Sequence, residues 1–443
     1  MNFVALQLFR VPEIRRRILT TLGLLLAYRV GFQIPIPGMN PEYVLRLGRD
    51  VGSTAFGLLS AFSGGMLGQT VMFALGIMPY ISASIIFSIL AKVSPRIEAL
   101  QKEGATGQKK INQYTRLATV PIAFLQALFI WFGIFTKDPD IVAPGQEGFL
   151  LMSTVVLALV AGAIFVMWLG EMITEYGVGN GASLIIMSGI IATMPASLQA
   201  MYAQQPDSAY NTMMMLFGLW IGIVLVIVFI QKGERRIPIQ YARLTRGRKM
   251  AFGPRHFLPI KVNMAGVMPI IFASALFILP SLLFGALGWE MLNGIVQDYD
   301  GFVHISLSML MVFGFCFFWN NLMFRPEEIA DNLREHGSFI PGLRPGAKTA
   351  DFLKGVLTRI TLAGAAFLAV IAVLPNFITG SIPGLQGDLA YFLGGTSVLI
   401  VVGVAQDLVD RLNAQLVMRN YEGFMKKGSG KGGVGAWARR SQG

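Results

Sequence analysis

The sequence has very little of the two residue types from which redox and metal sites are commonly built. It contains one cysteine, Cys316, and three histidines, at positions 256, 304 and 336. A single cysteine within an apolar run excludes an internal disulfide framework. The histidines are scattered and show no metal-ligand spacing. We therefore expect no structural disulfide, no metal site and no cofactor.

Charge is also scarce. Charged residues make up 14% of the 443 residues, hydrophobic residues make up 54%, and the mean hydropathy is +0.60. This composition is that of an integral membrane protein. The N-terminal apolar run continues through Arg29 to an Ile-Pro-Ile-Pro-Gly turn, so we expect a retained first helix in place of a cleaved signal. Stretches long enough to span a bilayer predict ten spans, at about 18–34, 71–91, 117–135, 149–169, 182–198, 212–230, 264–285, 302–324, 356–374 and 391–409.

The predicted spans hold almost no ionisable residues in their interiors. Arg29, Glu171 and Asp407 lie at or near span ends. Proton- and ion-coupled transporters usually need buried acidic residues or histidines for their relay. The sequence also lacks a Walker loop, the HExxH and GxSxG motifs, and paired intramembrane aspartates. These absences disfavour an enzyme and a coupled pump, and they leave a passive pore with apolar walls.

The positive charge is concentrated in alternate loops. Nearly all of the 36 lysines and arginines lie before the first span, in the even-numbered loops or in the tail. Because lysine and arginine favour cytoplasmic loops, ten spans with both termini in the cytoplasm are predicted. Two basic excursions, 231–263 and 325–355, are long for simple connectors and predict cytoplasmic docking loops. Bias from membrane orientation alone also explains much of this charge.

Residues 56–93 contain the most informative pattern of apolar residues in the sequence. Residues 56–67 are apolar, but the glycines near their end leave them too short to cross a bilayer. Residues 71–91 are long enough, and Pro79 falls inside this predicted span. A short helix joined by glycines to a full span is typical of a re-entrant segment. An interfacial amphipathic helix before an ordinary span explains the same pattern.

Several motifs closely resemble the SecY family, the pore subunits of the bacterial Sec protein translocon. They are FSGGM and FALGIMPYISASII within 62–86, WLGEMITEYGVGNGASLIIM at 168–187, LPIKVNMAGVMPIIFAS at 258–274, ADNLREHGSFIPGLRPG at 330–346 and GGTSVLIVV at 394–402. The resemblance covers about residues 10–425, with the motifs in the family's order. One motif alone is weak, but together they are specific.

The resemblance implies an all-α integral membrane fold. Ten transmembrane helices would form two inverted-repeat halves around a central hourglass pore, with a re-entrant plug helix. The implied divisions are an N-terminal half at 1–198 with the plug at about 56–67, an outer hinge loop at 199–212, a C-terminal half at 213–425, and a tail at 426–443. The glycine, serine and lysine content of the tail predicts a disordered basic segment.

The resemblance also implies functional positions, which fall into four sets. The pore ring would be Ile77, Ile81, Ile186, Ile271 and Ile400, and the plug would include Phe56, Leu59, Phe62, Gly64 and Gly65. The second and seventh spans would form a lateral gate carrying Ser82, Ser88 and Asn263, and partners would dock at Arg248, Lys249 and Arg344. Ser88 departs from the glutamine that the family commonly has in that turn. An apolar ring resists water and ions by dewetting, although isoleucine in a membrane helix more often serves packing.

The implied function is a protein-conducting channel subunit of the cytoplasmic (inner) membrane, with no enzymatic activity. It would pass unfolded secretory chains across the membrane and release apolar segments sideways into the phospholipid bilayer. The implied partners are the small subunits SecE and SecG, the motor ATPase SecA, the ribosome, and signal peptides with their unfolded precursors. Two alternatives are a small-solute secondary transporter, which needs a buried polar site, and an assembly scaffold without a pore.

Overall fold

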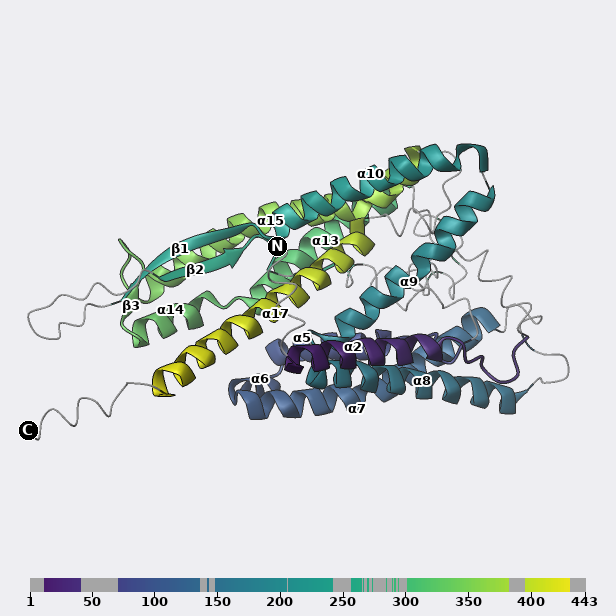
Figure 1. Ribbon diagram of the computed structural model, residues 1–443, viewed down its shortest axis with the longest axis horizontal. Helices are drawn as coiled ribbons and strands as arrows, with labels where there is room; N and C mark the ends of the chain where they lie inside the picture. The colour runs from purple at the N-terminus through teal and green to yellow at the C-terminus, as the bar shows by residue number, and fades with distance from the viewer. Residues whose placement is uncertain are drawn as a thin grey trace, which may run out of the picture.

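The structure is a computed structural model that describes residues 12–40, 71–135, 142, 148–204, 206–241, 256–264, 301–381 and 395–430, with a few isolated positions between 266 and 294. Within these residues the chain is mainly helical. The helices, labelled in Figure 1, are α2 Pro12–Gly31, α5 Met78–Val93, α6 Pro95–Lys102, α7 Ala105–Ile130, α8 Phe149–Tyr176, α9 Gly181–Gln204, α10 Pro206–Gln231, α13 Phe302–Met323, α14 Pro326–Glu335, α15 Ala347–Ser381 and α17 Gly395–Gly430. A π-helical turn, Trp131–Phe135, extends α7.

Nine of the ten predicted spans overlap helices in the described part of the chain, and the seventh, 264–285, lies mostly outside it. Four described helices, α8, α10, α13 and α15, are long and apolar enough to cross a bilayer by themselves. The pair α5 and α6 makes a fifth candidate, bent by 96° at its break. Helices α2, α7 and α17 include charged turns, as α2 does with Glu13 and the three arginines at 15–17, whereas α9 is uncharged and contains a shorter apolar stretch, Gly181–Ala192.

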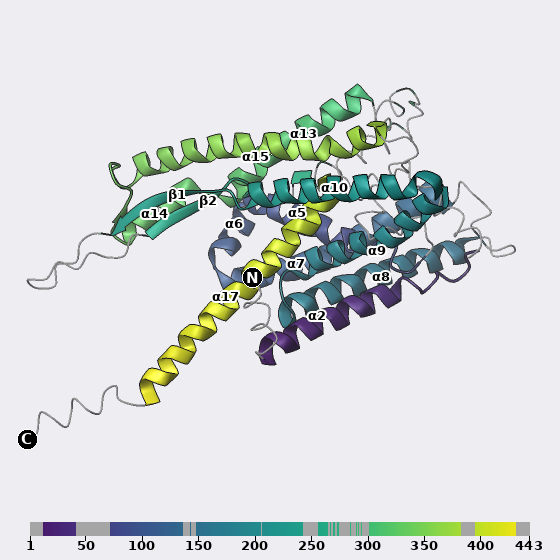
Figure 2. The same cartoon turned by 45° about the horizontal axis from the view of Figure 1, so that its top comes forward.

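The helices form two groups. Helices α2, α5, α7, α8 and α9 pack together, whereas α10, α13 and α15 lie on the other side of the molecule, and α17 runs between the groups (Figures 1 and 2). The α6 helix, the α14 helix and the end of α17 lie at one end of the molecule, and the α9–α10 turn lies at the other (Figure 1). The two predicted basic loops therefore emerge at the same end, as the alternating charge pattern predicted.

The basic loops contain a small sheet that the all-α expectation left out. Strands β1 Glu234–Tyr241, β2 His256–Lys261 and β3 Ser338–Phe339 pair antiparallel in the order β2-β1-β3, with Glu234 opposite Lys261 and Gln240 opposite Phe339. In β1, Ile237 and Ile239 are buried while their neighbours are more exposed. This alternation with a period of two is typical of a strand with one covered face. The covered face packs on α14 and the first turns of α15, through a cluster that includes Ile260, Phe324 and Leu353.

The structure differs from the expectation in three details. Pro79 occupies the first turn of α5, where its missing N–H is harmless, so it begins the helix and does not interrupt it. The predicted outer hinge loop, 199–212, is helical on both sides of residue 205, because its alanines, methionine and glutamines favour helix and Pro206 can start α10. The predicted disordered tail begins too early, since α17 continues through 426–427, which are lysines, to Gly430.

Candidate pore constriction and gate

The start of α5 is fixed by the end of α2 and its following turn. Val71 pairs with Pro35 in an antiparallel bridge, and the Met72 N–H donates a 3.1 Å hydrogen bond to the Ile34 carbonyl. Residues 72–77 then form turns, in which Gly76 has a φ of 52° that glycine adopts easily. The span predicted at 71–91 thus enters the helix only at Met78. This entry places Ile77 and Ile81 one helical turn apart at the centre of the first group.

The start of α9 is held equally tightly against α8. A Cβ atom added to Gly181 would lie 1.8 Å from the carbonyl oxygen of Gly170, so only glycine allows this approach. The Gly181 N–H donates a 2.9 Å hydrogen bond to the Thr174 hydroxyl, which itself donates to the Gly170 carbonyl at 2.9 Å. The close contact fixes the rotation of α9, and therefore the direction in which Ile186 points.

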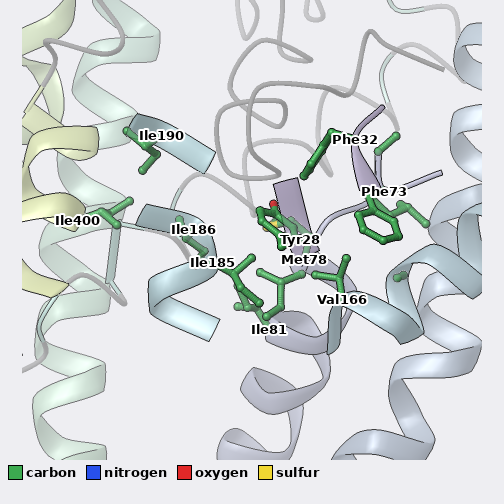
Figure 3. Packing of buried hydrophobic residues seen from close by; sticks show 14 of the residues in the cluster. Tyr28, Phe32, Phe73, Met78, Ile81, Val166, Ile185, Ile186, Ile190 and Ile400 are labelled. Carbon is green, nitrogen blue, oxygen red and sulfur yellow. The ribbon is translucent and has the colours of Figure 1, made fainter. Parts of the chain in front are cut away.

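Four of the five predicted ring residues, Ile77, Ile81, Ile186 and Ile400, belong to one large buried apolar cluster, and the last three come from three different helices. Ile81 of α5 is 7% exposed, Ile186 of α9 is 5% exposed and Ile400 of α17 is 2% exposed. Figure 3 shows Ile186 between Ile400 on one side and Ile81 on the other. These side chains present no polar group where the two helix groups meet. An apolar ring of this kind is the arrangement that the prediction of a pore requires, because apolar constrictions exclude water and ions by dewetting.

Ile77 belongs to the same cluster but packs toward α8, and Ile271 is the fifth predicted position. Ile77 is 1% exposed and packs against Gly170 of α8. A Cβ atom added to Gly170 would lie 3.1 Å from the Cδ1 atom of Ile77 and 3.4 Å from that of Ile185 of α9. Ile77 therefore supports α5 from the side of α8 in this structure. Ile271 lies outside the described residues, although the neighbouring Ile270 is buried in the same cluster.

The prediction from sequence omitted one residue of this region. Ile190, one turn after Ile186 on α9, is 4% exposed and lies near Ile400 in Figure 3. Residues four apart share a helix face, so the spacing from Ile186 was an available signal. The neighbouring Ile191 is 45% exposed and faces away, which makes it a natural control.

The predicted gate residues are partly described. The Ser88 hydroxyl donates a 2.8 Å hydrogen bond to the Ser84 carbonyl within α5, so its polarity is satisfied inside its own helix. Ser82 is half-buried on the same helix. The Asn263 side-chain amide donates a 3.1 Å hydrogen bond to the Gly266 carbonyl at the start of the predicted seventh span. Most of that span lies outside the described residues, and so does every plug position, Phe56, Leu59, Phe62, Gly64 and Gly65.

Of the predicted docking residues, Arg344 is described and exposed, whereas Arg248 and Lys249 lie outside the described residues. Arg344 lies in the turn between β3 and α15. Its carbonyl accepts a 2.9 Å hydrogen bond from the Thr349 hydroxyl, and glycines with positive φ flank it at 342 and 346. The backbone of this turn is therefore fixed while the guanidinium group projects freely.

The three ionisable residues that the sequence places at span ends differ in their partners, and Nη1 of Arg29 is buried without a hydrogen-bond partner among the described residues. Glu171 of α8 pairs with Arg116 of α7. Asp407 pairs with Arg411 one turn later on α17, at 2.8 Å, and the Arg29 guanidinium lies 5.7 Å from the ring centroid of Phe32. None of them belongs to the buried cluster that holds the isoleucines. Ile81, Ile186 and Ile400 therefore have no charged residue among the members of their cluster.

The sequence of this chain matches one protein family over most of its length. A family model described as SecY matches residues 71–409. The protein translocase subunit SecY of Thermotoga maritima is 41% identical over 433 residues, covering 96% of this chain and 98% of that one. The protein of the same description from Pseudomonas aeruginosa is 41% identical over 416 residues, covering 92% of each chain.

Two solved structures share the fold. One, described as "The structure of a protein conducting channel", has a TM-score of 0.63 at 19% identity and covers 93% of this chain and 96% of that one. The other, "Sec61 in the Canine ribosome-channel complex from the endoplasmic reticulum", has a TM-score of 0.61 at 19% identity, with the same coverage. The fold is therefore that of known helical membrane channels. Within that class the identity over nearly the whole chain decides the family. This chain belongs to the SecY family.

Proposed function

We propose that this chain forms the pore of a translocon in the cytoplasmic (inner) membrane. Unfolded secretory polypeptides pass through it, and apolar segments of membrane proteins leave sideways into the lipid. The observation that carries the proposal is the meeting of Ile81, Ile186 and Ile400 from three helices in one buried apolar cluster. An apolar ring can part around a chain of any sequence because it offers no group that binds one side chain in preference to another.

The finer assignments belong to this proposal. The two halves are residues 1–198 and 213–425, joined through 199–212, residues 56–67 act as the plug, and α5 with the seventh span forms the lateral gate. Both termini lie in the cytoplasm, together with the sheet and the exposed Arg344. SecE and SecG are the expected membrane partners, and SecA or the ribosome is expected to dock on the basic loops. The chain performs no covalent chemistry, so the energy for transport comes from the docked partner.

The small-solute transporter has no observation in its favour. Such a protein would need a polar binding site near mid-membrane, usually at broken helices that offer backbone groups or charges. Ile81, Ile186 and Ile400 belong to a buried cluster of hydrophobic side chains, which offers no such site. A scaffold without a pore would likewise not need a sealed constriction assembled from separate helices.

The deciding experiment is reconstitution in liposomes with SecE and SecG. An unfolded secretory precursor is added with SecA, in the presence and absence of ATP, and protection of the precursor from added protease is measured. We expect ATP-dependent protection that is lost when the precursor lacks its apolar signal segment. Failure to protect any precursor, or uptake of a small solute without polypeptide, contradicts the proposal.

A further inference from the structure

The small sheet has two edges that its own strands leave uncovered. Its strand order is β2-β1-β3, so β2 forms one edge, and no strand of the described chain pairs with the outer side of β2. At the other edge, β3 covers only the last two residues of β1, Gln240 and Tyr241. An uncovered strand edge offers N–H and C=O groups, and an extended polypeptide that comes near can pair with them as an additional strand.

The hydrogen bonds of the sheet show which backbone groups point to the free edge of β2. The Val262 N–H donates a 2.9 Å hydrogen bond to the Gly233 carbonyl, so these two residues form a hydrogen-bonded pair at the end of the ladder. Hydrogen-bonded and non-hydrogen-bonded pairs alternate along an antiparallel ladder. Phe257, Pro259 and Lys261 therefore fall at the non-hydrogen-bonded positions. Their backbone groups point away from β1, toward the free edge.

Pro259 occupies the middle of this free edge. Proline has no N–H, and in sheets it is found where the missing donor faces away from the partner strand. The free edge of β2 consequently offers donors only from Phe257 and Lys261, on either side of the proline. An added strand would lose its central hydrogen bond, and its carbonyl would meet the pyrrolidine ring. The Pro259 side chain is exposed, so burial gives no reason for a proline at this position.

Proline limits the other edge of the sheet in the same way. Gln240 of β1 pairs with Phe339 of β3, and the same register would bring Pro238 opposite Pro341. Residues two apart in a strand point their backbone groups to the same side, so this would be the next hydrogen-bonded pair, and neither proline has an N–H to donate. The absence of donors explains why β3 contains only two residues. It also leaves Pro238 facing outward where the cover of β3 ends.

We propose that Pro238 and Pro259 prevent the sheet from binding the unfolded chains that the channel transports. This inference rests on the proposed function, because a channel for unfolded polypeptides meets such chains continuously. An unfolded chain carries unpaired backbone groups along its whole length, and a free strand edge binds them through main-chain hydrogen bonds, largely regardless of side chain. The two prolines allow the basic loops to contain a rigid sheet that does not retain the transported chain.

The test restores the missing donor with Pro259→Val, because valine favours strands and its N–H would face the free edge. Pro345→Val, in the exposed turn before α15, makes the same replacement outside the strands and is the control. The probe is a short fluorescent peptide of alternating threonine and valine, added to the protein purified with SecE and SecG, and its binding is measured by fluorescence anisotropy. We expect Pro259→Val to bind the peptide about tenfold more tightly than the parent and than Pro345→Val, as a restored hydrogen bond gives.

Two further variants keep the inference testable if Pro259→Val is poorly folded or binds for another reason. Pro238→Val restores a donor at the other edge and should also gain affinity. Lys261→Pro, added to Pro259→Val, removes a neighbouring donor from the same edge and should abolish the gain. Equal affinity of Pro238→Val, Pro259→Val and the parent would overturn the inference.

A second peptide shows whether the binding is strand addition. It has the same side chains but carries a methyl group on every backbone nitrogen, so that it has no N–H to pair. We expect it not to bind Pro259→Val, and equal binding of the two peptides would overturn the inference. Because these measurements do not depend on transport, the two proposals fail separately. A parent that transports no precursor, beside a Pro259→Val protein that binds the peptide, would contradict the proposed function and leave the blocked edge standing.

Discussion

Gly162 of α8 lies directly against the backbone carbonyl of Met72, so that a Cβ atom added to this glycine would be 1.9 Å from the carbonyl oxygen. The contact joins α8 to the turns that lead into α5. Because the obstacle is backbone, it cannot move aside as the end of a side chain could. The position of the second predicted span therefore depends on the absence of a side chain in the fourth.

Gly162→Ala is expected to destabilise the protein by about 1–3 kcal/mol, the usual cost of overpacking a close-packed interior. The measurement is the temperature at which the detergent-solubilised protein loses its monodisperse chromatographic peak. Gly222→Ala in α10 is the matched control, because no atom lies within 4 Å of its added Cβ. Equal melting temperatures for the two variants would show that the Met72 contact is not tight.

Replacing a ring isoleucine by serine is expected to raise the ion leak of the resting channel, because a hydroxyl wets an apolar constriction. Ile81→Ser, Ile186→Ser, Ile400→Ser and Ile271→Ser should all leak, and Ile190→Ser should join them if the turn above Ile186 belongs to the seal. Valine at the same positions should change little. Ile191→Ser, on the exposed side of α9, is the control in liposome ion-flux measurements. Serine variants that are present at normal levels and as tight as the parent would remove these residues from the pore.

The buried pair Asn320 and Thr361 is expected to respond unequally to substitution. The Asn320 amide donates a 2.8 Å hydrogen bond to the Thr361 hydroxyl, joining α13 to α15, and its Oδ1 atom has no hydrogen-bond partner among the described residues. Thr361→Val removes the acceptor and leaves the whole amide unsatisfied, at a cost of about 1–3 kcal/mol. Asn320→Leu should cost less, since a threonine hydroxyl can turn to a carbonyl of its own helix.

Thermal unfolding of both single variants and the double variant measures this asymmetry. We expect a coupling energy of about 0.6 kcal/mol, with ~1.7 kcal/mol as the upper end for a hydrogen bond between membrane helices. The double variant should be no less stable than Thr361→Val alone. Asn320→Leu proving the more damaging single change would argue against the hydrogen bond and in favour of a packing role for the amide.

Arg344→Glu is expected to slow partner-driven transport without lowering stability. The side chain is exposed, and the turn is held by the Thr349 hydrogen bond to the Arg344 carbonyl, which the substitution keeps. Lys348→Glu makes the same charge change at an exposed position nearby and serves as the control for a general electrostatic effect. Transport of a precursor with SecA and ATP is compared for the two variants. Equal slowing by both would assign the effect to net charge on this face and not to Arg344.

Hydropathy alone predicted most of the membrane architecture, because crossing a bilayer requires long apolar stretches that few other constraints produce. It could not place the start of α5, since the bridge between Pro35 and Val71 draws residues 71–77 into turns before the helix begins. That bridge joins residues 36 positions apart and leaves no local signal. The sheet was different, because the alternation around Ile237 was present in the sequence but was hidden by the basic residues that pointed to a loop.

The residues of the candidate site were also predicted only in part from the sequence. The positions of Ile81, Ile186 and Ile400 came from the family resemblance, and their shared burial followed only when three helices were packed together. Ile77 has the same residue type and lies one turn from Ile81, yet it contacts Gly170 of α8. Which face of α5 meets the centre is decided by the glycines of α8, and those contacts are tertiary.

Helix α17 contains 36 residues, so at 1.5 Å per residue it is about 54 Å long. The hydrocarbon core of a bilayer is only ~30 Å thick. If the first turns of α17 lie in that core, beside Ile400, then its last turns extend roughly 20 Å beyond it. A fluorophore or an affinity tag attached after Gly430 would therefore be separated from the lipid surface by the last turns of α17. The helix therefore provides a ready-made spacer for surface immobilisation and single-molecule measurements on the assembled complex.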